Sequence, residues 1–434
     1  LSEIFRRCEV AFPPGIAGMV ATCLAFSVGS RIAPSATKSL ERFLAPTLQF
    51  VSLHLAMLFG PALVMLPTID FGGGDEGEGG GRGGGGAKAM RLMAVIALGF
   101  GGSFVSTVFI SRFFLYVSSR FGNRSTMTAA AKADIPSING RRWMETTLPY
   151  WCLLGALGFP MAARNPTDAV ACFPYLLALT GGGFSAGFLL PTILRVFLPP
   201  VATCMVATWA GVAVLSGVDG KTSETKILTN AYLPARAKES RESSKHHLPN
   251  LLATKGAGGV LLQLLDASLL VAGLQAYQFS PVILASGIGG LMASTSCAAA
   301  VNLVLMAALA QSASLDRDTA VALLTRGVTT AMAMPINQMM SSEVRCAHLP
   351  VLTAGICTSC GLFGAIVSPF LIKLMRITSP SQSALRGISA GSSAHGLGAA
   401  IFAGSDPRAF VYGVVTFGMV GAWSAMLLSE SSPF

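Results

Sequence analysis

The sequence predicts an all-α membrane protein, a polytopic bundle with room for about ten to twelve transmembrane helices. Hydrophobic residues make up 52% of the 434 residues, charged residues only 12%, and the mean hydropathy is +0.62. A soluble domain carries about 25% charged residues. The apolar runs are long and lack strict alternation, which favours helices over the closed barrel that also satisfies backbone groups in lipid.

The N-terminal region, residues 1–117, is expected to hold apolar spans near 12–29, 45–67 and 90–117. Residues 70–89, DFGGGDEGEGGGRGGGGAKA, form a Gly-rich linker within it. Such a segment cannot bury a core, so we expect it to be disordered. The chain begins at Leu1 and not at Met, so we expect a fragment or a processed form.

A basic connecting loop, residues 118–148, precedes a second region at 149–434, which contains a polar loop at 218–256. Further spans are expected near 149–163, 171–190, 194–217, 257–278, 280–311, 318–341, 349–375, 384–404 and 408–429. The formal net charge is +10, and we expect the excess basic residues to lie in loops that contact anionic lipid headgroups. Nucleic-acid binding is not expected, because no basic stripe with interleaved aromatic residues is present.

The first polar segment inside an apolar run is LLTRGVTTAMAMP at 323–335. Polar groups at that depth must face the bundle interior or a water-filled cavity. The candidate substrate-binding residues in this segment are Thr325, Arg326, Thr329 and Thr330. Gly327 and Pro335 make an interrupted helix plausible. An alternative stays open: the arginine side chain extends to the membrane surface, and the threonine hydroxyls form hydrogen bonds with the backbone.

The second polar segment is RGISAGSSAHGLGAA at 386–400. Its glycines allow the backbone to leave helical geometry or to approach another element closely. A half-helix N-terminus there would offer unpaired N–H groups and a positive dipole end to an anion. The candidate ligands are Ser392, Ser393, His395 and Gly396. The alternative is a tight helix contact of small residues around a hydrogen-bonded histidine.

Asp266 lies in a third apolar run, LLQLLDASLLVAGL at 261–274. An acid within a membrane is a candidate for proton coupling, and so is His395, because imidazole titrates near neutral pH. Asp266 can equally be the ion-pair partner of Arg326 or lie near a helix end. His54, in SLHLAMLF, is interpreted as a packing histidine.

No metal, no cofactor and no enzymatic activity are expected. Cys357 and Cys360 form the C-x-x-C, and the neighbouring glycines indicate a helix contact and not redox or zinc chemistry. The paired His246 and His247 lie in a charged stretch typical of a solvated loop. The G-x-G-x-x-G in the Gly-rich linker follows no strand, and no G-x-S-x-G motif is present.

The stretch GISAGSSAHGLGAAIFAGSDPRAF (387–410) resembles the C-terminal signature of the LrgB/CidB membrane family. TRGVTTAMAM and HLPVLTAGICTSCGLFGAIV, within 325–367, are similar to its second block, and KGAGGVLLQLL (255–265) is similar to the start of the helix before it. PPGIAGMVATCLAF and LAPTLQFVSLHLAMLFGPALVMLP resemble the LrgA/CidA partner, which plastidal glycolate/glycerate translocators of this family carry fused ahead of their LrgB half. The Gly-rich linker at 70–89, the charged insert near 235–247 and Asp266 depart from this pattern.

This resemblance implies a transporter that exchanges glycolate and glycerate across the plastid inner envelope in photorespiration. It also implies a secondary-transporter fold with inverted repeats and broken helices. Arg326 or the half-helix N-terminus would then hold the carboxylate of the substrate, and the serines and threonines would bond its hydroxyls. His395 would donate a hydrogen bond or carry a proton. Bacterial members imply an alternative, a holin-like oligomeric pore or regulator of lysis, and a homo-oligomer stays open.

Overall fold

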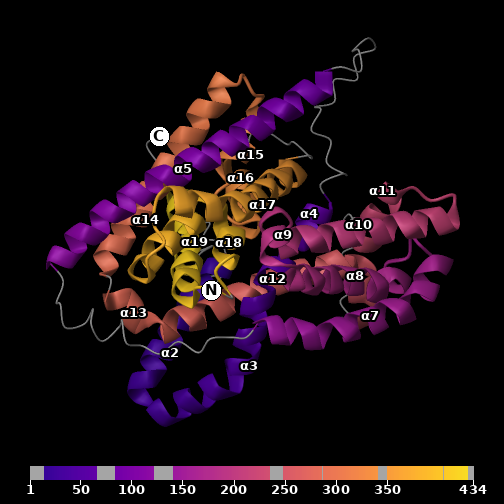
Figure 1. The fold of residues 1–434 in the computed structure, drawn as a ribbon, viewed down its shortest axis with the longest axis horizontal. Coiled ribbons are helices and arrows are strands. Elements are labelled where there is room, and N and C mark those ends of the chain that lie inside the picture. Colours follow the sequence, from indigo (N-terminus) through magenta and orange to yellow (C-terminus); the bar gives the residue numbers. More distant parts are fainter. Residues whose placement is uncertain are drawn as a thin grey trace. The chain divides into compact units, whose positions relative to one another are not determined.

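The computed structural model describes residues 14–65, 84–121, 140–234, 248–285, 287–340, 349–403 and 405–428. These residues are almost entirely helical and contain no strand, which confirms the predicted all-α fold (Figure 1). Within the described ranges, six helices are long and apolar enough to cross a membrane: Ala89–Ser118, Ala169–Leu189, Pro200–Asp219, Ile288–Ser312, Leu352–Leu374 and Pro407–Leu427. The protein is therefore a polytopic helical membrane protein, and the larger number of spans stays a prediction.

The helices have clear bounds along the chain. They are α2 Pro14–Ile32, α3 Pro34–Leu58, α4 Gly60–Val64, α5 Gly84–Phe121, α7 Gly140–Arg164, α8 Ala169–Leu189, α9 Thr192–Phe197, α10 Pro200–Asp219, α11 Glu224–Ile227, the π-helix η2 Leu228–Tyr232, α12 Leu248–Gln278, α13 Ser280–Ala285, α14 Ile288–Ser312, α15 Arg317–Leu324, α16 Thr330–Met340, α17 Leu349–Leu374, the 3-10 helix η3 Pro380–Gln382, α18 Ser383–Ala400 and α19 Pro407–Leu427.

The segments predicted as loops are partly helical. Helix α5 takes in residues 84–89 of the predicted linker, and α7 takes in residues from Gly140 of the predicted basic loop. The polar 218–256 segment holds α11, which the Ser223 side chain caps, and η2. A side-chain cap and not an apolar pattern marks the start of α11, so apolar periodicity alone misses this helix. Residues 70–83, 122–139 and 235–247, with His246 and His247, lie outside the described residues.

The chain forms two compact units that alternate along the sequence. Unit 1 comprises Leu1–Leu53, Phe71–Ile138 and Asp266–Phe434, and unit 2 comprises His54–Asp70 and Asn139–Leu265. Both units include segments that are far apart in the chain, so neither can be assigned from one continuous stretch of sequence.

Unit 2 is built on α7, α8 and α10, which pack against one another. Asp168 caps α8 by accepting from the Val170 and Ala171 N–H groups. A buried hydroxyl cluster joins Thr180 Oγ1 to Thr208 Oγ1 at 3.0 Å and to Tyr232 Oη at 3.3 Å. His54 is buried in this unit, with its ring centroid 5.8 Å from that of Phe184. This position agrees with its interpretation as a packing histidine.

Unit 1 has α18 at its centre. Helices α5, α17 and α19 pack against α18 (Figure 1), and residues 385–399 of α18 are all buried. Close approach depends on small residues: a Cβ atom on Gly391 would meet the backbone of Gly413 in α19 well inside van der Waals contact. The small-residue stretch that the sequence shows is therefore a buried helix with close neighbours, and it also carries the site described next.

Candidate functional site

The TRGVTT segment interrupts a helix. Helix α15 ends at Leu324 and α16 begins at Thr330, so residues 325–329 connect them without helical geometry. The interruption lies around Gly327, and Pro335 lies within α16. At Gly327 a Cβ atom would come within 3.3 Å of the Ser392 carbonyl oxygen, so this segment passes close to α18. The interrupted helix is present, as the sequence indicates.

Helix α18 is also broken. Its backbone leaves helical geometry at Ala394 (φ −134°, ψ 23°) and at His395 (φ 44°, ψ −142°). A residue other than glycine rarely adopts the positive φ seen at His395, and such a backbone conformation costs about 1–3 kcal/mol. Strain of this kind persists only where the surrounding packing imposes it, and it is common at ligand sites. The break falls at the histidine and not at one of the neighbouring glycines.

Arg326 lies where the two breaks meet. Its Nη2 donates to the Gly99 carbonyl at 2.7 Å and to Ser103 Oγ at 2.6 Å, both in α5. Its Nη1 donates to Cys360 Sγ at 3.1 Å and to the Ser393 carbonyl at 3.4 Å. The residue is only 1% exposed. The arginine is therefore held in the interior of unit 1 and does not snorkel to a surface.

The electrostatic balance around Arg326 favours an anion. Among the residues that the structure describes, its hydrogen-bond partners are carbonyl, hydroxyl and sulfur atoms, and none is a carboxylate. A buried charge without a counterion costs several kcal/mol. The carbonyl end of the first part of α18 offsets part of this cost, because a helix C-terminus carries partial negative charge. The remaining positive charge suits an anionic ligand.

The break in α18 places two half-helix ends in the 387–396 region. The sequence suggested that a half-helix N-terminus in this region would face the anion. The first half of α18 ends at Ser393, and the second half begins near Gly396. The carbonyls of Ser392 and Ser393 accept from Asn302 Nδ2 at 2.9 Å and from Arg326. The guanidinium therefore contacts the carbonyl end of the first half, and a role for the N-terminus of the second half stays a prediction.

The predicted hydroxyl ligands fall into two groups. Thr325, Ser392 and Ser393 each donate to a backbone carbonyl in the preceding turn, and Ser392 Oγ also lies 3.2 Å from Thr107 Oγ1. Thr329 and Thr330 are buried, and their hydroxyls have no hydrogen-bond partner among the described residues. Buried polar groups are nearly always paired. Thr329 and Thr330 are thus the hydroxyls best able to accept a ligand.

His395 joins the break in α18 to α17. Its Nε2 lies 2.8 Å from the Cys357 carbonyl oxygen. A Cβ atom on Gly361 would come within 2.6 Å of the same ring nitrogen, so only glycine lets α17 approach the imidazole this closely. Cys357 Sγ donates to the Thr325 carbonyl at 3.4 Å, and Cys360 Sγ to the Ser393 carbonyl at 3.5 Å. The C-x-x-C thus forms the predicted helix contact, against both breaks.

Two asparagines belong to the site and were not singled out in the sequence. Asn302 of α14 donates to the Ser392 carbonyl, and Asn337 of α16 donates to Thr325 Oγ1 at 3.0 Å and to Thr353 Oγ1 at 2.8 Å. An amide side chain inside an apolar run is costly to bury in lipid, so it marks a candidate functional position in the sequence.

Gly396 begins the second half of α18. Asp266 lies in α12, with its side chain outside the described part, so its role stays a prediction.

These features define a class: an all-α membrane protein in which two broken helices meet at a buried arginine. Residues 252–432, which contain both breaks, match the model of the LrgB-like family, and this confirms the resemblance found in the sequence. The chain is also similar to the plastidal glycolate/glycerate translocator 1, chloroplastic, of Arabidopsis thaliana. The two are 22% identical over 436 residues, which cover 99% of this chain and 76% of that protein. No solved structure matches the chain.

Proposed function

We propose that this protein is a secondary transporter that exchanges glycolate and glycerate across the plastid inner envelope, as part of photorespiration. One observation carries the proposal: a buried arginine at the junction of two broken helices, which has no carboxylate partner among the residues that the structure describes. Discontinuous helices form substrate sites in secondary transporters. The similarity to the Arabidopsis translocator supports this choice of substrates.

Both substrates carry a carboxylate next to a hydroxyl, and the site offers a group for each. Arg326 would bind the carboxylate, because a guanidinium matches it with two parallel hydrogen bonds. Thr329 and Thr330 would bond the substrate hydroxyls. Ser392, Ser393 and Gly396 would shape the opposite wall of the site. Since Arg326 is 1% exposed, the binding groups become accessible only when one part of the bundle moves against another.

His395 is the first candidate for proton coupling, because it is an ionisable residue at the break in α18, beside the Cys357 carbonyl. Asp266 is the second. In either case a proton would travel with the anion and cancel its charge. Strict exchange of one anion for another needs no proton, so the two modes differ in their response to a pH gradient.

The test is uptake of labelled glycolate by proteoliposomes, with or without internal glycerate and with or without a pH gradient. Exchange predicts saturable uptake that internal glycerate stimulates. Proton coupling predicts additional uptake when the outside is acidic. A holin-like pore, the alternative that bacterial relatives suggest, would instead give unsaturable leak that also admits unrelated solutes, and this result would refute the proposal.

A further inference from the structure

Three buried hydroxyls on one face of α5, Ser103, Thr107 and Ser111, form what we call the hydroxyl row. They follow one another at intervals of four residues, which places them on the same face of the helix, and all three are completely buried. Ser103 Oγ accepts from Arg326 Nη2 at 2.6 Å. Thr107 Oγ1 lies 3.2 Å from Ser392 Oγ in α18. The hydroxyl row therefore begins at the buried arginine and continues along the contact between α5 and α18.

The protons of these hydroxyls are not used as they commonly are in a helix. A serine or threonine inside a helix often donates to a carbonyl in the preceding turn, as Ser106 of α5 does to the Ser103 carbonyl at 3.0 Å. Ser111 Oγ, in contrast, has no hydrogen-bond partner among the described residues. Ser103 Oγ accepts from Arg326, and its own proton has no acceptor in the same part of the chain. The row thus holds buried donors that no carbonyl satisfies.

Ser389 of α18 adds another unused donor from the facing helix. Its hydroxyl is completely buried and has no partner within the described ranges. Its carbonyl accepts from the Ser392 and Ser393 hydroxyls, so it lies one turn before the residues that contact Thr107 and Arg326. Buried polar groups are nearly always paired, and an ionised carboxylate offers only acceptors. Unused donors on both helices therefore match a carboxylate.

The hydroxyl row extends from the middle of a membrane span toward one of its ends. The span in α5 is Ala89–Ser118, and Ser103 lies near its midpoint. Ser111 lies two turns further along, about 12 Å at 1.5 Å per residue. Half of the hydrocarbon core of a bilayer is about 15 Å thick. The row therefore covers most of the distance from Arg326 to one membrane surface.

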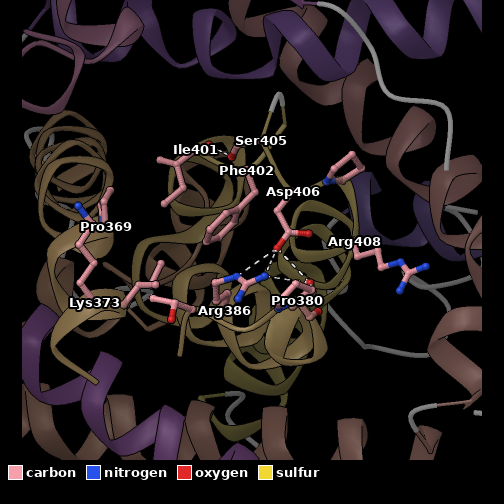
Figure 2. Close-up of a pocket in the computed structure, with 13 residues that line it drawn as sticks. Pro369, Lys373, Pro380, Arg386, Ile401, Phe402, Ser405, Asp406 and Arg408 are labelled. Carbon is pink, nitrogen blue, oxygen red and sulfur yellow. Dashed lines mark hydrogen bonds and ion pairs between the residues drawn. The ribbon is translucent and has the colours of Figure 1, made fainter. Parts of the chain in front are cut away.

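The ends of α5, α17 and α18 are linked at this side of unit 1. Arg112 Nη2 donates to the Met375 carbonyl at 3.1 Å, just after α17 ends. Arg386, near the start of α18, donates to the Ile377 carbonyl at 2.9 Å and to Asp406 (Figure 2). The outer end of the hydroxyl row thus lies where α17 ends and α18 begins.

We propose that the hydroxyl row, with Ser389 facing it, is the path along which the substrate carboxylate moves between Arg326 and the membrane surface at this side. Its donors replace the hydrogen bonds that the anion makes in water. Because these residues are buried, the path is closed in this structure and opens when α5 separates from α18. The proposal rests on the proposed function and adds the route of the anion. It assigns part of that route to α5, which lies outside the residues 252–432 that match the LrgB-like family.

Exchange and binding, measured on the same variants, distinguish a path from a binding site. Ser111→Ala and Ser389→Ala should each lower the maximal rate of glycolate–glycerate counter-exchange in proteoliposomes by about tenfold, which corresponds to about one hydrogen bond. The Kd for labelled glycerate, measured on the purified protein, should stay within twofold, because Arg326 is unchanged. The matched control is Ser106→Ala, which removes a hydroxyl of α5 that the Ser103 carbonyl already uses, and its exchange should stay within twofold of the wild type.

The outcomes that contradict the path differ from those that contradict the proposed function. Normal exchange by both variants beside normal exchange by the wild type would overturn the path alone, whereas no exchange by the wild type would refute the proposed function. An equal loss of rate and affinity would place these hydroxyls in the binding site and overturn the path. If the variants lose only the response to a pH gradient, the row carries protons and the proposal is wrong.

A thiol at position 111 supplies a readout that does not depend on the lost hydroxyl. Ser111→Cys, reconstituted and treated with an anionic or a cationic methanethiosulfonate, should lose exchange at least about tenfold faster with the anionic reagent, after correction for the rate of each reagent with a free thiol. Added glycolate should slow this loss. The wild type gives the background rate of the native cysteines, and Ser106→Cys is the control. Equal rates for the two reagents, or no protection by glycolate, would overturn the path.

Discussion

Arg326 is the residue on which the account depends most. Its side chain is among the largest that the structure buries completely, and its hydrogen bonds reach α5, α17 and α18. Such an arginine both joins these helices and carries the charge that an anion would neutralise. Among the described residues this charge has no carboxylate partner, and an uncompensated buried charge costs several kcal/mol, which a role confined to joining helices does not explain.

Thr329 and Thr330 should determine whether the site distinguishes a hydroxy acid from a plain acid. Because these buried hydroxyls have no hydrogen-bond partner among the described residues, Thr→Val at either position should not lower the free energy of unfolding. The preference for glycolate over acetate, measured by competition with labelled glycerate, should fall by about tenfold. This factor corresponds to the net free energy of about one hydrogen bond.

Thr37→Val is the matched control for these variants. Thr37 is also buried in unit 1, and its hydroxyl donates to the Ala33 carbonyl within the N-terminal helices. Its removal should leave the preference between glycolate and acetate unchanged. An equal loss of preference in the control and in the Thr329 variant would show that neither hydroxyl at the crossing binds substrate.

His395→Gln should reduce exchange by at least about tenfold, because the ring holds the Cys357 carbonyl and fixes the break in α18. The matched variant is His54→Gln, which changes a buried histidine in unit 2. Its exchange rate should stay within twofold of the wild type. The measurement is the initial rate of counter-exchange in proteoliposomes, and equal rates in the two variants would contradict the role of His395.

At the scale of single residues, the sequence predicts which polar residues form the site but not all of their contacts. Arg326, Thr329, Thr330 and His395 stand out because each is polar inside an apolar run. The Gly99 carbonyl that accepts from Arg326 does not stand out, because every residue has a carbonyl and this one lies 227 positions away. Asn302 gives the same polar signal as the threonines and lacks only a surrounding motif.

At the scale of the element, α18 depends on small residues for its fit. Gly391 faces the backbone of Gly413, and Gly364 of α17 faces Ala394 at the break. Helix association in membranes gains from such close packing, because lipid gives no hydrophobic drive between helices. The small residues of this stretch therefore serve packing and the site together, and the two interpretations offered by the sequence do not exclude each other.

Gly391→Ala should destabilise the protein by about 1–3 kcal/mol, because the new methyl group meets backbone that cannot rotate away. Gly101→Ala is the control: it lies in α5 of the same unit, and a Cβ atom there would meet nothing within 4 Å. Thermal unfolding in detergent should show a lower Tm for the first variant only. A Tm equal to that of the wild type would mean that α18 and α19 are further apart than the structure places them.

The sequence also predicts that helices break, but it places the breaks less well. Gly327 marks the interruption between α15 and α16 correctly. In α18 the break falls at Ala394 and His395, although several glycines lie nearby and tolerate such geometry better. Contacts from α17 set this position, and local preference cannot report contacts between distant segments.

At the scale of the whole molecule, the helices form two units with interleaved segments. Helix α12 runs from unit 2 into unit 1, since the division falls between Leu265 and Asp266. The proposed binding groups all lie in unit 1, and the buried hydroxyl cluster around Thr180 lies in unit 2. Composition predicts the class of protein because it reflects the lipid environment, whereas this interleaving depends on long-range contacts that composition does not encode.

The most direct test of the central claim compares counter-exchange in the wild type and in Arg326→Gln. Both proteins are reconstituted in equal amounts from monodisperse preparations, loaded with glycerate and given labelled glycolate outside. The control is Arg376→Gln, which changes an exposed arginine that follows α17. Loss of a buried charged partner costs about 2–5 kcal/mol, so Arg326→Gln should slow exchange at least ~30-fold while the control stays near the wild type. Wild-type exchange by Arg326→Gln would contradict the account.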